Sequence, residues 1–242
     1  MFEPGSLVIV ADRPLPAANS LSPALKAKTT VVACDPGAAP DLPETLQGLA
    51  AGERPDLALV CVSPAVLPET LRRLSPLAPR SVILLPHELP DPYPRGTLAL
   101  CRAWAEENRC ELLGPRSFGA QRPHAGLNLS QHPVLARAGR VALLAQSRSI
   151  MAAVMDWAED VHIGFSTAVS LGDEAVVGLS KVLDYLASDP RTDSIVLYLE
   201  DVGPAREFMS TLRAAASVKP VIVLKAGRAD TDSADAIFDA AL

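Results

Sequence analysis

The sequence predicts an α/β protein built from parallel, doubly wound sheets, and two observations lead to this fold class. Hydrophobic residues make up 49% of the 242 residues, whereas aromatic residues make up only 4%. Cores made mainly of Ala, Leu and Val are typical of proteins in which helices cover both faces of parallel strands. In addition, short apolar runs bounded by turn residues alternate with helix-like stretches, which is the pattern of βαβ units.

The first unit is expected over residues 1–122. Its expected strands are Leu7–Val10, Thr30–Ala33, Leu57–Val62, Ser81–Leu85 and Glu111–Leu113. Helix-like stretches at Pro68–Leu74 and Gly96–Asn108 lie between them. The segment Gly114–Gly139 is rich in Gly, Pro, Asn and Ser and has no sustained apolar period. It is interpreted as loop, with a linker over residues 123–138.

The pattern restarts in a second unit, expected over residues 139–242. Strands are predicted at Arg140–Ala145, Ile163–Ser170, Ser194–Leu199 and Val221–Leu224, and helices at Ser149–Ala158, Val176–Ala187 and Pro204–Ser217. The last residues, ADAIFDAAL, begin an amphipathic pattern that no strand follows. We therefore expect the chain to be a fragment of a longer polypeptide, truncated within its second unit.

Composition argues against several classes of function. The formal net charge is −6 and no Lys/Arg cluster reaches five residues, so nucleic-acid binding is not expected. No apolar run reaches the roughly 18 residues of a membrane span, and no signal peptide precedes the first strand, so a cytoplasmic protein is expected. No metal site is predicted, because the histidines and cysteines lack ligand spacing. Free, reduced thiols are expected at Cys34, Cys61, Cys101 and Cys110.

The most informative local feature is the polar turn that follows the strand ending at Ala145. Gln146, Ser147, Arg148 and Ser149 join that strand directly to a helix. Free amide groups at the start of a helix, aligned with its dipole, are suited to holding a phosphate group. The simpler alternative is that Ser147 or Ser149 only caps the helix, and from the motif alone this alternative is the more frequent one.

A second feature is Glu200, which closes the apolar run SIVLYLE. Ligands of doubly wound sheets gather at the carboxyl ends of strands, so a carboxylate there is suited to orienting an imidazole or binding a polar ligand. The alternative is a solvated acid at a strand end, beside Asp201.

Ordered motifs resemble a known family. LLGPRSFG resembles a GPNxxG turn, HAGLNLS a GLNxS stretch, and GRVALLAQSRSIMAAVMDWA the strand, phosphate turn and helix usually written with SQSG. IGFSTAVSLGDEA, VLDYLASDPRTDSIVLYLE, AREFMSTLRAAA and KPVIVLKAGR follow in order. This order, spanning Leu112–Arg228, is similar to the NDP-forming acyl-CoA synthetases, which share their architecture with the α part of succinyl-CoA synthetase.

The resemblance implies a Rossmann-like CoA-binding domain followed by a flavodoxin-like, succinyl-CoA ligase-like domain. It implies phosphate binding by Gln146, Ser147, Arg148 and Ser149, and it makes Glu200 the acid that supports a phosphorylated histidine. CoA or acetyl-CoA is the expected ligand, and ATP or ADP would require segments outside this chain. The expected cofactor contacts in the first unit are Ala11, Asp12, Arg13, Ser63, Pro64 and Pro86.

Three departures from the family pattern predict that no catalytic residue remains. Arg148 stands where the family has a small glycine, so its side chain would either block a phosphate or bind it. The turn after the first strand, ADRPLPAANS, has no glycine. After KAGR the family continues through a segment containing SHTG, which supplies the phosphorylated histidine, whereas ADTDSADAIFDAAL follows here.

This pattern is similar to bacterial protein lysine acetyltransferases, in which a ligase-like region is fused to a GNAT-type domain. The preferred hypothesis is therefore a catalytically degenerate regulatory module that binds CoA or acyl-CoA, belongs to a longer polypeptide with a GNAT or ATP-grasp domain, and forms homo-oligomers. One alternative is the active α part of an ADP-forming acetyl-CoA or acyl-CoA synthetase that works through phosphohistidine. Another is a purely structural interaction domain.

Overall fold

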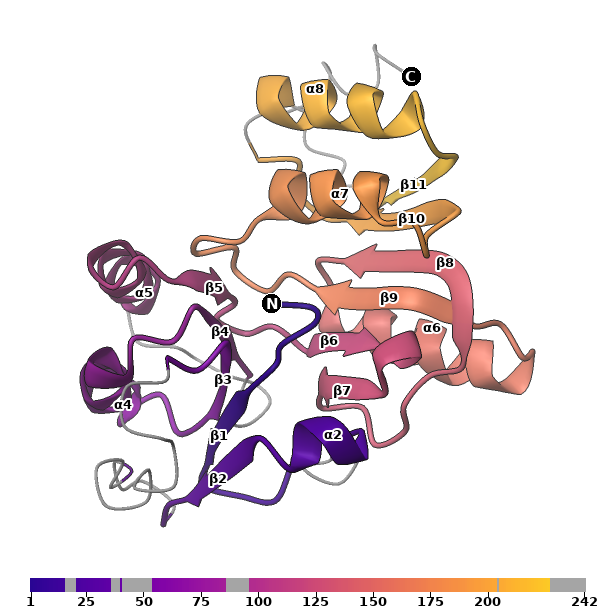
Figure 1. The fold of residues 1–242 in the computed structure, drawn as a ribbon. Coiled ribbons are helices and arrows are strands. Elements are labelled where there is room, and N and C mark those ends of the chain that lie inside the picture. The colour runs from indigo at the N-terminus through magenta and orange to yellow at the C-terminus, as the bar shows by residue number, and fades with distance from the viewer. Residues whose placement is uncertain (16–20, 36–39, 41–53, 86–95, 204, 227–242) are drawn as a thin grey trace.

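The protein contains two sheets that consist mainly of parallel strands, which confirms the expected α/β class (Figure 1). The structure is a computed structural model, and it describes residues 1–15, 21–35, 40, 54–85, 96–203 and 205–226. Within these ranges, none of the helices combines the length and the apolar character that a membrane crossing requires.

The first sheet has five parallel strands in the order β2-β1-β3-β4-β5. The strands are β1 (Leu7–Ala11), β2 (Thr29–Ala33), β3 (Leu57–Cys61), β4 (Ser81–Leu84) and β5 (Glu111–Leu113). Its helical segments are α2 (Pro23–Lys26), α4 (Leu67–Leu74), η1 (Ser75–Leu77) and α5 (Thr97–Glu107). All residues of β1, β3 and β4 are buried, because these strands are covered on both faces.

Helices α4 and α5 cover one face of the first sheet (Figure 1). There, side chains such as Val60 and Val82 pack in one cluster with Leu71 and Trp104. The other face lies against the second unit, and a single apolar cluster runs from Ile9 through to the second sheet. The two units therefore share a buried core.

The cysteines contribute to this core as free thiols. Cys61, Cys101 and Cys110 are buried, and Cys34 is half-buried. Burial raises the pKa of Cys101 to about 11 and that of Cys110 to about 12. Both groups therefore remain neutral thiols at physiological pH and behave as small apolar side chains.

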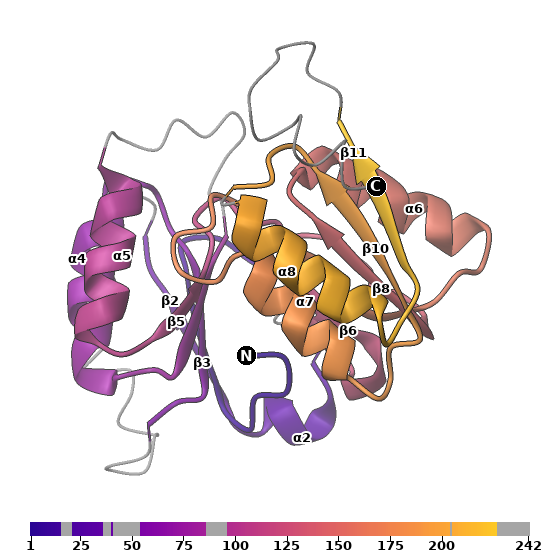
Figure 2. The ribbon, with the colours of Figure 1, turned by 90° about the horizontal axis from the view of Figure 1, so that it is seen from above.

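The second sheet has six strands in the order β11-β10-β8-β9-β6-β7. Four of them run parallel, and these are β8 (Ala138–Ala145), β9 (Phe165–Ser170), β10 (Ser194–Leu199) and β11 (Val221–Lys225). The expected strands of the second unit are thus all present. Helix α6 (Arg148–Asp160) covers one face, and α7 (Leu179–Ser188) and α8 (Ala205–Ala216) cover the other (Figure 2).

The interpretation of residues 123–138 as a linker is wrong. The short strand β6 (Gly119–Arg122) pairs antiparallel with β9 on one side and with β7 (Leu127–Ser130) on the other, and the 3-10 turn η2 (Pro123–Ala125) joins the two. Part of the predicted linker therefore forms the edge of the second sheet.

Buried polar side chains explain why β6 and β7 were not predicted from the sequence. The Gln121 Nε2 group lies 3.1 Å from Asn128 Oδ1 and 3.0 Å from Ser130 Oγ. The three side chains are buried and satisfy one another, so they replace the apolar alternation from which strands are predicted.

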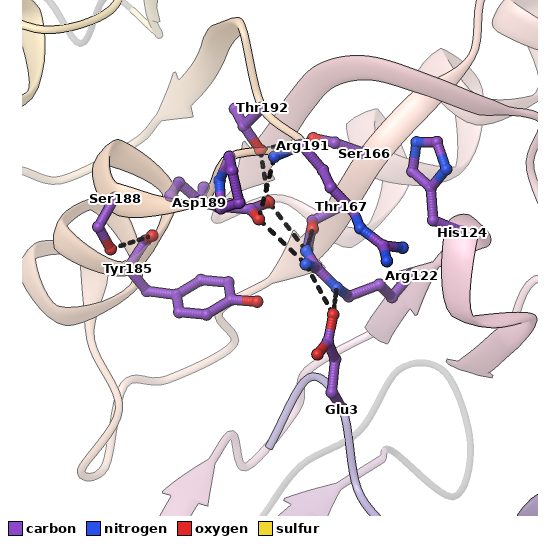
Figure 3. A network of polar contacts seen from close by, with 12 residues as sticks. Glu3, Arg122, His124, Ser166, Thr167, Tyr185, Ser188, Asp189, Arg191 and Thr192 are labelled. Carbon is purple, nitrogen blue, oxygen red and sulfur yellow. Dashed lines mark hydrogen bonds and ion pairs between the residues drawn. The ribbon is translucent and has the colours of Figure 1, made fainter.

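A buried ion-pair network joins the N-terminal segment to the second unit (Figure 3). The Arg122 guanidinium donates two hydrogen bonds to the carboxylate of Asp189, at 2.9 and 3.1 Å, and one to Thr167 Oγ1 at 2.7 Å. Glu3 lies 2.9 Å from the same guanidinium. The side chains of Arg122 and Asp189 are only 4% and 3% exposed, so neither charge has water as a substitute partner.

The Asp189→Asn substitution should destabilise the protein strongly, because it leaves the buried Arg122 guanidinium with only the half-exposed Glu3 as a counter-ion. We expect a loss of about 3 kcal/mol in the free energy of unfolding, which corresponds to roughly 6–12 °C in Tm. Asp184→Asn, on the exposed side of α7, is the control and should change Tm little. Thermal unfolding of the two variants checks this, and equal Tm values would contradict it.

The same pair predicts an acid-sensitive contribution to stability. Burial alone would raise the pKa of Asp189, but hydrogen bonds from Arg122 and Thr192 lower the pKa from 3.8 to about 2. A carboxyl group with a depressed pKa in the folded state stabilises the protein above pH 3.8, and this contribution is lost as the pH falls toward 2. Urea unfolding between pH 5 and about 2.5 should therefore show a steeper loss of stability for the wild type than for the Asp189→Asn variant.

Candidate functional site

A large cavity, with a volume of about 860 Å³, lies at the carboxyl edge of the second sheet. Strands β8, β9 and β10 all end at this edge, where the ligands of parallel sheets gather. The structure brings together here all of the residues predicted for phosphate binding or for its support, which are Gln146, Ser147, Arg148, Ser149 and Glu200.

The Gln146 side chain holds the edge of the cavity together and is not free to bind a ligand. Its Oε1 atom accepts hydrogen bonds from the backbone amides of Glu200 and Asp201, at 2.7 and 2.9 Å. Its Nε2 group donates to the Glu174 carboxylate at 2.8 Å and to the Asp201 carbonyl at 2.7 Å. Gln146 therefore fixes the turn that carries Glu200 and leaves any ligand contact to its neighbours.

The start of α6 is open toward the cavity. Ser147 occupies the N-cap position with extended backbone, but its side chain makes no capping hydrogen bond to the helix. Arg148 and Ser149 form the first turn, and both line the cavity with Ser147. In the part of the chain that the structure describes, the N-cap side chain therefore leaves the helix dipole and the first amides open to an anion.

The start of α7 lines the same cavity but is already capped. Glu174 Oε2 accepts a hydrogen bond from the backbone amide of Leu179 at 2.9 Å, and its Oε1 atom is held by Gln146. Gly178 makes this close approach possible, since a Cβ atom there would lie 2.8 Å from Glu174 Oε2. An anion from solution would have to displace a carboxylate of the protein at α7, whereas it would not at α6.

Charges of both signs surround the cavity. Four cationic and five acidic side chains line it, namely Arg102, Arg116, Arg148, Lys181, Asp173, Glu174, Glu200, Asp201 and Glu207. Arg116 Nη1 lies 3.4 Å from Asp173 Oδ1. Burial raises the pKa of Asp173, and the positive charges of Arg116 and Arg148 oppose that rise. Affinity for an anion would therefore depend on the local arrangement around α6, because the net charge of the lining is not positive.

The first unit also reaches this cavity. Arg102, on α5, donates a hydrogen bond from Nε to the Ala175 carbonyl at 3.0 Å, across the junction between the units. Arg102, Arg116 and Glu174 were not among the residues predicted for the site. Each is isolated in the sequence from the motif around Gln146, so only the three-dimensional arrangement identifies them.

The residues predicted to contact CoA lie at the carboxyl edge of the first sheet. Asp12 follows β1, and its Oδ2 atom accepts a hydrogen bond from the Ser63 amide after β3 at 3.1 Å. Ala11 and Asp12 are buried, whereas Arg13 is exposed and lies 3.7 Å from Asp12. These residues, with the half-buried Pro64, are not part of the large cavity's lining, and Pro86 lies outside the described residues.

Comparison with known families identifies the second unit. Residues 138–241 match the succinyl-CoA ligase-like flavodoxin domain. This match makes the second unit similar to that domain family. The first unit, which precedes this domain, has a doubly wound parallel sheet with the strand order β2-β1-β3-β4-β5.

The curated relatives that match include ADP-forming ligases. Acetate–CoA ligase I of Archaeoglobus fulgidus is 38% identical over 127 residues, which is 52% of this chain and 18% of the relative. The α subunit of acetate–CoA ligase I of Pyrococcus furiosus is 35% identical over 119 residues, which is 49% of this chain and 26% of the relative. The chain thus spans about a quarter or less of these proteins, and the matches relate it to the NDP-forming acyl-CoA synthetases.

A solved structure shares the fold of nearly the whole chain. The dinucleotide-forming acetyl-coenzyme A synthetase 1 of Ca. Korarchaeum cryptofilum superposes with a TM-score of 0.80 at 23% identity, and the match covers 98% of this chain and 56% of that one. An ATP citrate lyase from Methanothrix soehngenii, in complex with citrate and coenzyme A, gives a TM-score of 0.68 at 15% identity and covers 94% of this chain and 41% of that one.

Replacing Gln146 should loosen the turn that carries Glu200. In a Gln146→Ala variant the Glu200 and Asp201 amides lose their hydrogen-bond acceptor. We expect the free energy of unfolding to fall by about 1–3 kcal/mol. Hydrogen exchange at these two amides should become at least tenfold faster. Ser149→Ala is the matched control, since it removes only an exposed hydroxyl group from the same cavity. Exchange rates measured by NMR check this, and unchanged rates in the Gln146→Ala variant would contradict the positioning role.

Proposed function

We propose that this chain is a regulatory module that binds CoA or an acyl-CoA, within a longer protein lysine acetyltransferase. The module has the scaffold of an acyl-CoA synthetase, and it senses its ligand without converting it. An anionic group of the ligand binds at the start of α6, opposite Glu200.

The open start of α6 is the observation that carries the proposal. Helices α6 and α7 both begin at this cavity. Among the described residues, the carboxylate of Glu174 caps α7, whereas the N-cap residue of α6, Ser147, makes no capping hydrogen bond. Arg148 adds a positive charge in the first turn of α6, where a phosphate group gains both the amides and the guanidinium as partners. In this proposal Arg148 binds the anion and does not block it.

The histidines support binding without phosphoryl transfer. His124, His132 and His162 do not line the large cavity, and each is bonded elsewhere in the described part of the chain. The fourth, His87, lies outside the described residues, and none occurs between His162 and Leu242. Phosphoryl transfer through histidine needs an imidazole at the phosphate site, and none of the described histidines lies where Glu200 could orient it.

The acetyltransferase context rests on the residue-level resemblance. Arg148 in the phosphate turn, the SLGD wording at residues 170–173 and the missing SHTG segment all agree with the ligase-like regions that are fused to GNAT-type domains. In that context a GNAT domain of the longer polypeptide carries out the acetyl transfer, and this module reports the level of acetyl-CoA.

The first unit offers a partial fit for CoA. Arg13 is exposed at the carboxyl edge of β1, where its guanidinium suits a phosphate of CoA. The Ser63 amide does not suit that role, because it already donates to Asp12. Arg13 is therefore the candidate for holding the CoA phosphates, with Ala11 and Pro64 as its neighbours.

Isothermal titration with CoA and acetyl-CoA tests the proposal. The wild type should bind both ligands, and Arg13→Gln should weaken binding about tenfold, because it removes a charge-assisted hydrogen bond to phosphate. Arg213→Gln, on the exposed side of α8, should bind like the wild type. A folded wild-type sample that gives no heat at millimolar ligand would refute the proposal and favour a purely structural domain.

The alternative is that the chain is the active α part of an ADP-forming acyl-CoA synthetase. The names of the relatives favour it, as does the position of Glu200, which Gln146 fixes at the phosphate turn. To test it, the full-length protein is incubated with ATP, acetate, CoA and an ATP-grasp partner. Acid-labile protein phosphate together with acetyl-CoA formation would establish this alternative, whereas neither product is expected if the module is regulatory.

A further inference from the structure

A second cavity, of about 420 Å³, lies between the two units and is separate from the large one. Ser22 and Lys28 reach it from the segment around α2 in the first unit. His124, from η2, and Arg191, from the turn between α7 and β10, reach it from the second unit. Figure 3 shows the side chains of His124 and Arg191 close to Arg122, on the side of the buried ion-pair network.

Two cationic side chains of the second cavity have no ion-pair partner among the described residues. Lys28 and Arg191 are exposed, and in the described ranges neither side chain forms a hydrogen bond or an ion pair. Glu3 is the acidic residue of the lining, and its carboxylate already pairs with Arg122 at 2.9 Å. The protein has a net charge of −6, so a cavity with two unmatched cations departs from its average surface.

The remaining lining suits a small organic anion. The buried side chains of Leu25 and Leu127 contribute apolar surface, and a cavity of this size exceeds what an inorganic ion needs. Apolar walls keep water away from one side of an ion pair and so strengthen it relative to an exposed pair. Lys28 would act as a point charge, and Arg191 would offer the planar fork that matches the oxygens of phosphate.

We propose that this cavity binds a phosphate monoester, with Lys28 and Arg191 holding the phosphate group from opposite units. The bound anion connects α2 to the turn after α7, and it lies beside the contact between Glu3 and Arg122. Occupancy therefore stabilises the arrangement of the two units, because a ligand that binds only the folded form raises its stability. This site is separate from the ligand contacts proposed above at the start of α6 and at Arg13.

Inorganic phosphate is the probe for the test. Phosphate is titrated into the ¹⁵N-labelled protein at constant ionic strength, set with chloride, and the affinity is read from the amides of Leu25, Lys28 and Arg191. In a Lys28→Gln/Arg191→Gln variant we expect the affinity at these amides to fall at least tenfold. Lys26→Gln is the matched control, because Lys26 is exposed on α2 but does not line the cavity. It should retain the wild-type affinity.

Glycerol 3-phosphate and glycerol form a second pair of titrations. The monoester should bind more tightly than inorganic phosphate, whereas glycerol should not shift these amides. Equal phosphate affinity in the double variant and the wild type would overturn the proposal, as would the absence of any shift at these amides. Phosphate shifts confined to Arg148 and Ser149 would also overturn it, and that result would leave the proposed site at α6 standing.

Discussion

The candidate site depends on a single side-chain amide, that of Gln146. It follows β8, accepts hydrogen bonds from the turn after β10, and donates one to Glu174 in the loop after β9. Three neighbouring strands of a parallel sheet are thereby held together at their carboxyl ends. Glu174 in turn caps α7 by accepting a hydrogen bond from the Leu179 amide. By holding Glu174, the Gln146 amide therefore keeps the start of α7 capped, whereas the start of α6 stays open to a ligand.

The junction between the units is the second constraint. A shared apolar core joins the two sheets, and Arg122, Asp189 and Glu3 place a buried charge network within that junction. The network fixes the orientation of the units at the amino ends of the strands in the second sheet. Arg102 adds a contact near the opposite edge, at the large cavity. Both cavities therefore lie where residues of the two units meet, so ligands at either cavity are suited to sensing the arrangement of the units.

Much of the fold could be predicted from the sequence, because most of its strands are apolar runs. Strands such as β3 and β8 follow directly from such runs between turn residues, and α6 follows from its apolar spacing. Strands β6 and β7 could not be predicted, since Gln121 and Asn128 are buried there as mutual hydrogen-bond partners. In a sequence, Gln and Asn residues predict a loop, and only the structure shows that these two are buried as hydrogen-bond partners within strands.

The sequence predicted only those parts of the site whose residues lie close together in the chain or at the end of a strand. The polar turn at Gln146–Ser149 and the strand-end position of Glu200 are visible in the sequence, and the rule for parallel sheets places them at one edge. The role of Glu174 could not be predicted, because it requires a contact with the α7 amide and a left-handed backbone at φ 51°. Nor could the sequence reveal that the Gln146 side chain is already engaged by the protein.

The most direct test of the open α6 start is an NMR titration of the labelled protein with acetyl-CoA. We expect saturable shifts of the Arg148, Ser149 and Glu200 amides, with the Leu179 amide at the capped start of α7 changing far less. Saturable binding that leaves the α6 amides unchanged and shifts the Leu179 amide would contradict ligand binding at α6, because the ligand would then bind at the helix that Glu174 already caps.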